Sequence, residues 1–395
     1  MLFDPKRLKT LLRSKAIDVA VITSPENVYY LSQYTGPMYP WSGCTTCVVF
    51  PTEGSPSLIV NMCEGLAPFS QETEIRDIRF YDEFYFYFSQ ELPPEENEFR
   101  KAYDTYYARG TKSDISAVKE AIESQRLRSG AKIGVERSMP RFLRNALEQF
   151  FPNAKLEDVT PLFQEARIIK TEEETRRLRE VAKINEKALN AAIESIHVGV
   201  SEWELVMAYR QELDRQKAEP IFNLINAGKR GGELFPTYRH AHKLQRGDVV
   251  RMDVGCRYNG YSSDLSRSVT LGQLSPSDER IRQAVLKGCW STISGLKPGL
   301  AVREVFQKAI EMIRQAGIPD FRRSNIGHGI GMDAHELPDM SGSSPTTLEK
   351  DMVLNIETPY YGVGIGGFQQ EDTARITDDG VEIITHLDRD IRLSG

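Results

Sequence analysis

The sequence predicts an α/β domain followed by a larger α+β domain that is built from two related halves. Its 395 residues exceed what one typical hydrophobic core holds, so two domains are expected. Helix-like and strand-like segments alternate over the first part of the chain, which is typical of an α/β domain. A short motif recurs in the second part, which indicates an internal repeat. We therefore expect domains at residues 1–160 and 161–395.

In the first domain, short apolar runs alternate with amphipathic ones. The expected strands are 17–23, 45–50, 57–61 and 132–135, and the expected helices are 5–14, 25–31 and 140–151. Cys44 and Cys47 have the spacing of a redox or metal motif. Because Cys47 runs straight into an apolar strand, a structural role is favoured for this pair.

Residues 80–88 (FYDEFYFYF) carry an unusual concentration of aromatic side chains. A partly buried edge strand is the simplest interpretation. A dimer surface or a substrate lid is the alternative. The polar stretch 93–110 that follows predicts a loop and a charged helix.

A long helix begins the second domain, because Thr171 and Glu174 form a capping-box pattern ahead of an apolar stripe. The repeated motif follows it. Residues 198–205 (VGVSEWEL) are echoed at 298–305 (PGLAVREV), and in both copies a glycine stop precedes a new amphipathic helix. Two α+β halves are expected, with helices outside, sheet inside and an active site between the halves.

Residues 251–270 predict a β-hairpin that carries two acids. Alternation places Asp253 at the end of an extended run, and Asn259-Gly260 is a strong two-residue turn signal. The returning strand brings Asp264 back past Asp253. Two carboxylates in a core repel each other unless one is protonated or cations lie between them, which suggests a metal site.

Three further residues could complete such a site. His328 lies between glycines, which would let the backbone approach a ligand closely, and a glycine-rich structural turn is the alternative interpretation of this stretch. Glu357 ends an apolar strand, and Glu371 lies within another. Four carboxylates and one imidazole suit Mn²⁺, Fe²⁺, Co²⁺ or Zn²⁺, especially as a bridged pair.

The order and spacing of these segments resemble the creatinase/aminopeptidase P/prolidase family of pita-bread metallopeptidases, most closely its Xaa-Pro peptidases. The similar stretches are MDVGCRYNGYSSDLSRS, GHGIGMDAHELP, NIETP, GGFQQEDTARITDDG and, in the first domain, PENVYYL. The resemblance implies a creatinase/prolidase-type N-terminal domain, a pita-bread catalytic domain with a pseudo-twofold repeat, and a homodimer.

The resemblance also implies roles for individual residues. Asp253 would bind one of two divalent ions, Mn²⁺ first among the candidates. Asp264 and Glu371 would bridge both ions, and His328 and Glu357 would complete the second. The implied catalytic residues are His328, His335, which would contact the substrate, and Glu357, which would carry a proton to the leaving amine.

The chain departs from the family pattern at two places. Thr237, beside Tyr238, stands where many members have histidine. Either His240 or His242 takes over its contact with the substrate, or the site treats its substrate differently; a solvated loop is the alternative interpretation of both histidines. Gln369 stands where the family commonly has arginine, so charged recognition from that position is lost. These five residues are the expected substrate-binding set.

Three classes of function follow. The first is a dinuclear metal-dependent hydrolase that cleaves N-terminal Xaa-Pro or similar amide bonds of small peptides. The alternative is a non-peptidase relative, a hydrolase or lyase, that acts on a small amide, cyclic or urea-like metabolite with the same metal site. A binding protein without catalysis is disfavoured because all five ligand positions are intact.

Composition excludes other partners. The formal net charge is −6, so no basic field favours nucleic acid. The chain lacks an apolar run long enough for a membrane, and the N-terminus lacks the apolar region of a signal peptide. Five cysteines, an odd number, suggest a reducing compartment, and we expect a cytoplasmic protein.

Overall fold

The structure is a computed structural model that describes residues 2–36, 45–71, 73–110, 112–235 and 242–394. The chain divides into two compact units, Met1–Ala166 and Arg167–Gly395, slightly beyond the expected junction. Among the described residues, no helix is long and apolar enough to cross a membrane.

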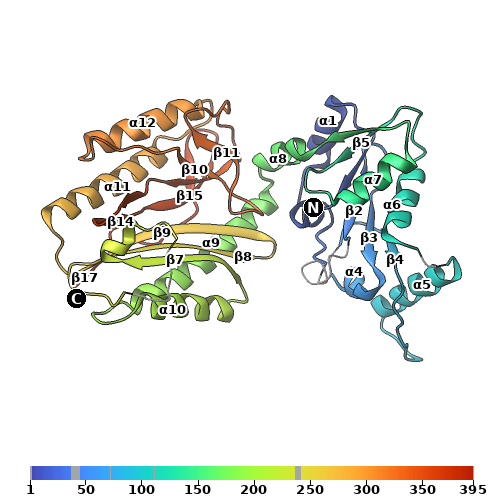
Figure 1. Ribbon diagram of the computed structural model, residues 1–395, viewed down its shortest axis with the longest axis horizontal. Helices are drawn as coiled ribbons and strands as arrows, with labels where there is room; N and C mark the ends of the chain where they lie inside the picture. Colours follow the sequence, from blue (N-terminus) through green and yellow to red (C-terminus); the bar gives the residue numbers. More distant parts are fainter. Residues whose placement is uncertain (1, 37–44, 72, 111, 236–241, 395) are drawn as a thin grey trace. The chain divides into compact units, whose positions relative to one another are not determined.

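The first unit contains a six-stranded mixed sheet with the order β4-β3-β2-β1-β5-β6 (Figure 1). Its strands are β1 (Val19–Ile22), β2 (Cys47–Pro51), β3 (Ser57–Asn61), β4 (Asp77–Tyr81), β5 (Lys132–Val135) and β6 (Lys155–Asp158). Its helices are α1 (Pro5–Ser14), α2 (Pro25–Ser32), η1 (Met62–Glu64), α4 (Ala67–Ser70), α5 (Pro94–Ala108), α6 (Asp114–Glu123), α7 (Arg141–Phe150) and α8 (Thr160–Ile168).

Helices cover both faces of this sheet, as the alternation of segments predicts. Apolar residues of α6 and α7 form one core with alternate residues of the strands, such as Val49 of β2. On the other face, Phe50 meets Phe3, whose ring lies 5.5 Å from that of Tyr30 in α2. The expected α/β domain is confirmed. Cys47 is a buried free cysteine of β2, and Cys44 lies outside the described residues.

The aromatic segment 80–88 is a strand only at its start. β4 is an edge of the sheet and ends at Tyr81, so the edge-strand interpretation holds for Phe80 and Tyr81 alone. Phe86 and Phe88 then pack on Phe99 of α5, because their rings are buried better there than along a sheet edge. Tyr87 is fully exposed. The dimer surface and the lid stay predictions.

The second unit is built on a sheet with the order β11-β10-β12-β15-β9-β8-β7, which β16 and β17 extend (Figure 1). Its helices are α9 (Glu172–Glu194), α10 (Glu202–Arg215), η2 (Gly228–Gly232), α11 (Pro276–Ser294) and α12 (Val302–Gln315). Its strands are β7 (Glu219–Ala227), β8 (Val249–Tyr258), β9 (Tyr261–Leu271), β10 (Asn325–Gly329), β11 (Glu336–Ser341), β12 (Val353–Glu357), β13 (Tyr360–Gly362), β14 (Gly366–Phe368), β15 (Glu371–Ile376), β16 (Val381–Ile383) and β17 (Arg392–Leu393).

The expected internal repeat is present, because the two copies of the motif make matching backbone hydrogen bonds. The amide of Gly199 donates to Leu244 O at 2.8 Å, and the amide of Gly299 donates to Leu348 O at 2.8 Å. Isolated bridges follow at matching places, 201 with 243 and 301 with 347. Each copy leads from a long helix (α9 or α11) into a shorter one (α10 or α12). The α+β domain of two halves is confirmed.

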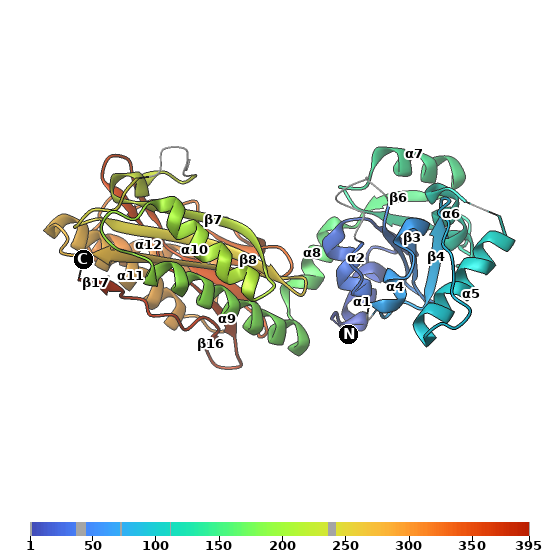
Figure 2. The ribbon, with the colours of Figure 1, turned by 90° about the horizontal axis from the view of Figure 1, so that it is seen from below.

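The helices cover one face of this sheet, and the other face is left for polar side chains. Leu354 and Ile356 of β12 join the core under α11 and α12. The alternate residues Asn355 and Glu357 therefore point to the opposite face. α9 contacts β8 and β9, and α10 contacts β7, as Figure 2 shows from below.

Candidate metal centre

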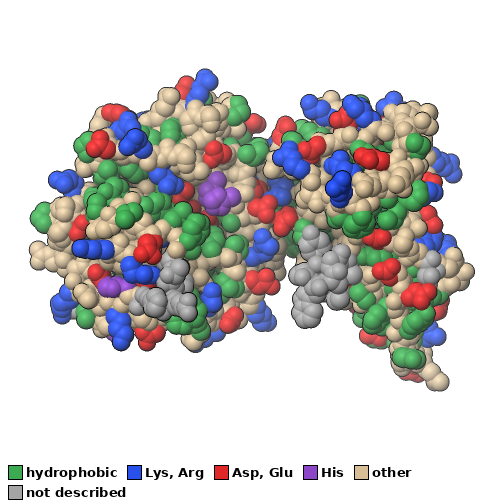
Figure 3. All heavy atoms as spheres, in the orientation of Figure 1, with side chains coloured by type: hydrophobic (Ala, Val, Ile, Leu, Met, Phe, Trp, Pro, Cys, Tyr) green, Lys and Arg blue, Asp and Glu red, His purple; other side chains and the backbone are tan. Residues whose placement is uncertain are grey.

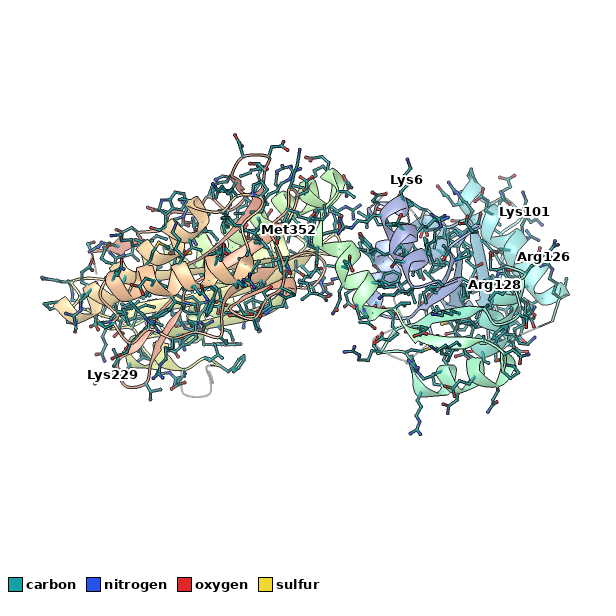
Figure 4. The ribbon with its side chains drawn as sticks, turned by 90° about the horizontal axis from the view of Figure 1, so that it is seen from above. Lys6, Lys101, Arg126, Arg128, Lys229 and Met352 are labelled. Atoms are coloured by element: carbon teal, nitrogen blue, oxygen red, sulfur yellow. The ribbon has the colours of Figure 1, made fainter. Side chains whose placement is uncertain are left out.

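Among the described residues, groups of acids and histidines close enough to hold a metal ion occur in one place, in the second unit. Histidine side chains reach the surface of this unit (Figure 3). Two hollows of about 380 Å³ in the first unit are lined in part by Lys101 and by Arg126 and Arg128 (Figure 4). Neither brings acids and histidines together in this way.

The β8–β9 hairpin places Asp253 and Asp264 on the same face of the sheet. Asn259 and Gly260 have positive φ angles of 48° and 77°, as the expected two-residue turn requires. Asp253 is opposite Ser266, two positions beyond Asp264 on the same strand. The two acids are diagonal neighbours, close enough for their side chains to interact.

Register across the remaining strands brings three more residues to this face. Glu371 of β15 is opposite Ser266 of β9, and Glu357 of β12 is opposite Glu371. His328 of β10 is opposite Asn355, two positions before Glu357. Since side chains alternate in strands, all five predicted ligands share the face that the helices leave free.

The glycines beside His328 have a structural role, which agrees with the structural alternative for this stretch. A Cβ on Gly327 would lie 2.0 Å from Asn355 O of β12, and one on Gly329 would lie 2.1 Å from Leu337 O. The glycines therefore allow close packing of β10 between its neighbouring strands, not the approach of a ligand. This packing sets the position of His328.

The distances within the group fit metal ligation. Asp253, Asp264 and Glu371 each offer a carboxylate oxygen within 4.8 Å of the others, and Asp264, His328 and His335 do the same. The Oδ1 atom of Asp264 is buried and has no hydrogen-bond partner among the described residues. A buried carboxylate oxygen without a donor is costly, and a cation is the partner that this donor set suits.

The electrostatics of the acids point the same way. Burial raises the pKa of Asp253 to about 6, although nearby Arg251 lowers it. Burial, reinforced by the neighbouring acids, also raises the pKa of Asp264 and of Glu371 well above the ordinary values. The pKa of Glu357 is raised by burial, against Arg323 and Arg251. Divalent cations would supply the missing positive charge.

His328 has the orientation of a metal ligand. Its Nδ1 atom lies 3.0 Å from Gly329 O, so Nδ1 carries the proton and the lone pair of Nε2 is free. Nε2 lies 3.7 Å from Asp264 Oδ2 and 3.8 Å from Glu371 Oε1. Burial lowers the pKa of His328, which favours the neutral, ligating form. The ring of His335 stacks on it with centroids 3.7 Å apart.

The expected substrate-binding residues are placed less uniformly. Gln369 is buried behind Glu357, and its Nε2 atom donates to Glu357 Oε2 at 3.3 Å. His242 does not line the pocket; its Nε2 atom lies 2.7 Å from Asp248 Oδ2. Thr237, Tyr238 and His240 lie outside the described residues.

The sequence patterns did not predict three residues beside the centre, Arg251, Arg323 and Tyr361. Arg251 of β8 is fully buried, and its Nη1 atom lies 3.6 Å from Asp253 Oδ2. Arg323 donates from Nη2 to Glu357 Oε1 at 3.4 Å, and Tyr361 lies near both arginines. A buried arginine two positions before Asp253 was the available signal, because arginine is rarely fully buried without an anionic partner.

A pocket of about 560 Å³ opens over the group. The metal-ligand candidates, His335, Arg323 and Tyr361 line it on the polar side. Four apolar side chains line it as well, those of Phe222, Leu224, Leu234 and Phe235, and Leu224 is opposite Asp253 in the β7–β8 register. The pocket thus combines acids, imidazoles, a guanidinium and an apolar surface, as sites for small organic molecules do.

Two family models match the chain. The model of metallopeptidase family M24 matches residues 176–378, and that of the creatinase/prolidase N-terminal domain matches residues 6–169. An Xaa-Pro dipeptidase of Pyrococcus furiosus is 33% identical over 238 residues, which cover 60% of this chain and 68% of that protein. An Xaa-Pro dipeptidase of Pyrococcus horikoshii is 30% identical over 260 residues, 66% of this chain and 74% of that protein.

Solved structures agree over the whole chain. The prolidase from Pyrococcus horikoshii OT3 is 25% identical, with a TM-score of 0.77 and 98% of each chain covered. An X-Pro aminopeptidase from Thermotoga maritima is 21% identical, with a TM-score of 0.78 and 99% of each chain covered, which shows a shared fold. The fold is thus common to a structure named as a prolidase and to one named as an X-Pro aminopeptidase.

Proposed function

The chain belongs to metallopeptidase family M24, and on this premise we propose that it is a dinuclear metal-dependent hydrolase that cleaves the amide bond of an Xaa-Pro peptide. The observation that carries the proposal is the buried group of four acids and one imidazole on one face of the sheet, with raised carboxyl pKa values. The printed names of the relatives supply the Xaa-Pro substrate class.

We assign the five predicted ligands to two divalent ions. Asp264 and Glu371 lie at the middle of the group, near Asp253 on one side and His328 on the other, so they would be shared. Glu357 would bind on the His328 side, because the two residues are two positions apart in register. The ions would activate a water molecule and polarise the scissile carbonyl. Mn²⁺ is our first candidate for this oxygen-rich set.

Glu357 is the residue that we assign to proton transfer. Gln369 and Arg323 each donate a hydrogen bond to it, so both of its oxygens are oriented. Glu357 lines the pocket beside the proposed ions, where it would take a proton from the activated water and pass it to the leaving amine. His335 stacks on His328 with its exposed ring at the pocket, where it can contact the substrate carbonyl.

The apolar side chains that line the pocket give it a reason to select proline. Phe222, Leu224, Leu234 and Phe235 line the same pocket as the acids, so the carbon ring of a proline residue can be buried against them. Burial of apolar surface stabilises a complex by roughly 25 cal/mol per Å². A charged side chain at the same place would lose that contribution and its own hydration.

A substrate panel tests the proposal. The purified protein is loaded with Mn²⁺, its metal content is measured, and Ala-Pro, Ala-Pro-Gly, Ala-Ala and a set of small cyclic amides are offered. Release of alanine from a proline peptide, with little from Ala-Ala, is expected. No turnover of any proline peptide at full metal occupancy would reject the peptidase. Turnover of a cyclic amide instead would favour the non-peptidase alternative.

A further inference from the structure

Two guanidinium groups lie over the ring of Tyr361, at the edge of the pocket. The Cζ atom of Arg251 is 5.1 Å from the ring centroid, and that of Arg323 is 5.6 Å from it. Both arginines approach the metal-ligand candidates, Arg251 at Asp253 and Arg323 at Glu357. Their hydrogen bonding differs, and this difference shows which of them can meet a substrate.

Arg251 has no capacity left for a ligand. Its side chain is fully buried, and it does not line the pocket. Nε donates to Asn226 Oδ1 at 3.0 Å and Nη1 to Gln369 Oε1 at 3.0 Å. Nη2 donates to the carbonyl oxygens of Glu233 and Leu234, at 2.9 and 3.1 Å. Arg251 therefore has a structural role, because it connects β7, residues 233–234 and Gln369 by hydrogen bonds.

Arg323 lines the pocket and keeps free capacity. Its side chain is 18% exposed, and its buried Nε atom has no hydrogen-bond partner among the described residues. Its one acidic partner in the described part of the chain is Glu357, at a long 3.4 Å. Under the proposed function, a cation compensates the charge of Glu357, so the charge of Arg323 remains available to an anion.

A carboxylate is the anion that this geometry suits. The planar guanidinium can donate two parallel hydrogen bonds to both oxygens of one carboxylate. In an Xaa-Pro dipeptide, the free carboxylate carbon is three bonds from the scissile carbonyl carbon. Arg323 lines the pocket and donates to Glu357, a proposed metal ligand, so a carboxylate that close to the scissile bond lies on the same side of the pocket as its guanidinium.

We propose that Arg323 binds the free C-terminal carboxylate of the substrate, which makes the chain a dipeptidase instead of an aminopeptidase for longer peptides. The inference rests on the proposed function and deepens it, since the fold is shared by both kinds of peptidase. It also places the cationic side chain that binds the substrate at position 323, whereas the family pattern would have placed it at position 369.

The test compares Ala-Pro with Ala-Pro amide and Ala-Pro-Gly in the Mn²⁺-loaded full chain. For the wild type, we expect kcat/KM to be roughly 10- to 100-fold higher for Ala-Pro than for Ala-Pro amide, the range of a charged hydrogen bond. Arg323→Gln should remove this preference by lowering activity on Ala-Pro alone. Arg323→Lys should keep part of it, because it retains charge without the planar fork.

Arg322→Gln is the matched control. It removes the same charge from the neighbouring, exposed residue, which does not line the pocket. This variant should keep the wild-type preference. Metal content and thermal unfolding of all variants separate a substrate contact from damage to Glu357 or to the fold. Retained preference in a folded, metal-loaded Arg323→Gln variant would overturn the inference while leaving the proposed function in place.

Binding gives a readout that does not need turnover. Calorimetric titration with L-proline and with L-prolinamide should show tighter binding of L-proline to the wild type and to Arg322→Gln, and equal binding of the two compounds to Arg323→Gln. Equal affinity of the wild type for both would overturn the inference. If no proline peptide is cleaved, the proposed function fails, and this titration still decides whether Arg323 holds a carboxylate.

Discussion

The second unit contains two groups with buried acids. Burial acts to raise the carboxyl pKa values in both groups, but nearby cationic side chains outweigh this effect in only one of them. The metal centre holds Asp253, Asp264, Glu357 and Glu371, and burial raises the pKa of each. Glu336, directly after His335, belongs to the second group. Burial alone would raise its pKa as well, but Arg167 and Lys170 lower it to about 2.

The second group, a buried ion-pair cluster of Arg167, Lys170, Asp333 and Glu336, is complete within the protein. Arg167 bonds to Glu336 and, at 2.6 Å, to Asp333. Lys170 Nζ lies 3.0 Å from Glu336 Oε2 and donates to Arg167 O at 2.6 Å. Burial of acids therefore does not by itself identify a metal site. The candidate metal centre differs from the ion-pair cluster because its cationic side chains are too few to balance the charge of its acids.

The largest expected effect is at the centre itself. Asp264→Asn replaces the carboxylate that we assign as a bridging ligand by a neutral amide, so we expect the metal content to fall and kcat/KM to drop by about 1000-fold or more. Elemental analysis and Ala-Pro turnover measure the two losses. Asp320→Asn, on an exposed aspartate, is the control. A variant with unchanged activity would refute the assigned centre.

A change in the ion-pair cluster should lower the stability of the protein. Glu336→Gln leaves Arg167 and Lys170 buried with one charge too few, which costs about 3–5 kcal/mol of the free energy of unfolding. Chemical denaturation measures it. Glu349→Gln removes the same charge at an exposed position and should change stability by less than about 0.5 kcal/mol. Equal stabilities of the two variants would contradict the comparison.

Acid should weaken the same cluster. The pKa of Glu336 is about 2 in the folded protein and ordinarily 4.5, so its contribution is present above pH 4.5 and is lost as the pH falls toward 2. That shift corresponds to about 3 kcal/mol. The difference in unfolding free energy between the wild type and Glu336→Gln should therefore shrink between pH 6 and pH 3. A constant difference would argue against an ionised Glu336.

The smallest effect is expected at Gln369, where the candidate metal centre already has the cationic side chain of Arg251 beside it. Gln369→Arg adds a second guanidinium beside Arg251, and like charges should lower kcat/KM about tenfold. Arg251→Gln combined with Gln369→Arg moves the charge from β8 to position 369 and should recover part of the loss. A double-mutant cycle in activity and metal affinity checks this coupling. Strict additivity would show that the two positions are independent.

Local patterns predicted the elements that carry the centre. The Asn259-Gly260 turn and the alternation before it were enough to predict that Asp253 and Asp264 lie close together on one face of the hairpin. The capping box of Thr171 and Glu174 forms as expected. The repeat was visible because both copies use the same order of glycine and helix start.

Contacts between segments that are distant in the chain could not be predicted from local sequence patterns. Nothing local indicates that Glu371 lies opposite Ser266 of β9, or that Arg251 reaches Gln369. No charge was expected at position 369 because Gln369 is neutral, whereas Arg251 of β8 brings a guanidinium to it. Arg323 precedes its strand in an irregular segment, where no periodicity shows which way a side chain points.

The matched halves also bear on how the enzyme is made. The first half supplies Asp253 and Asp264, and the second supplies His328, Glu357 and Glu371, so neither half alone carries the full ligand set. During synthesis, the assigned centre is complete only after β15 has left the ribosome and joined β9 and β12. Tight metal uptake would thus mark a finished catalytic unit, and partly made chains would stay inactive toward cellular peptides.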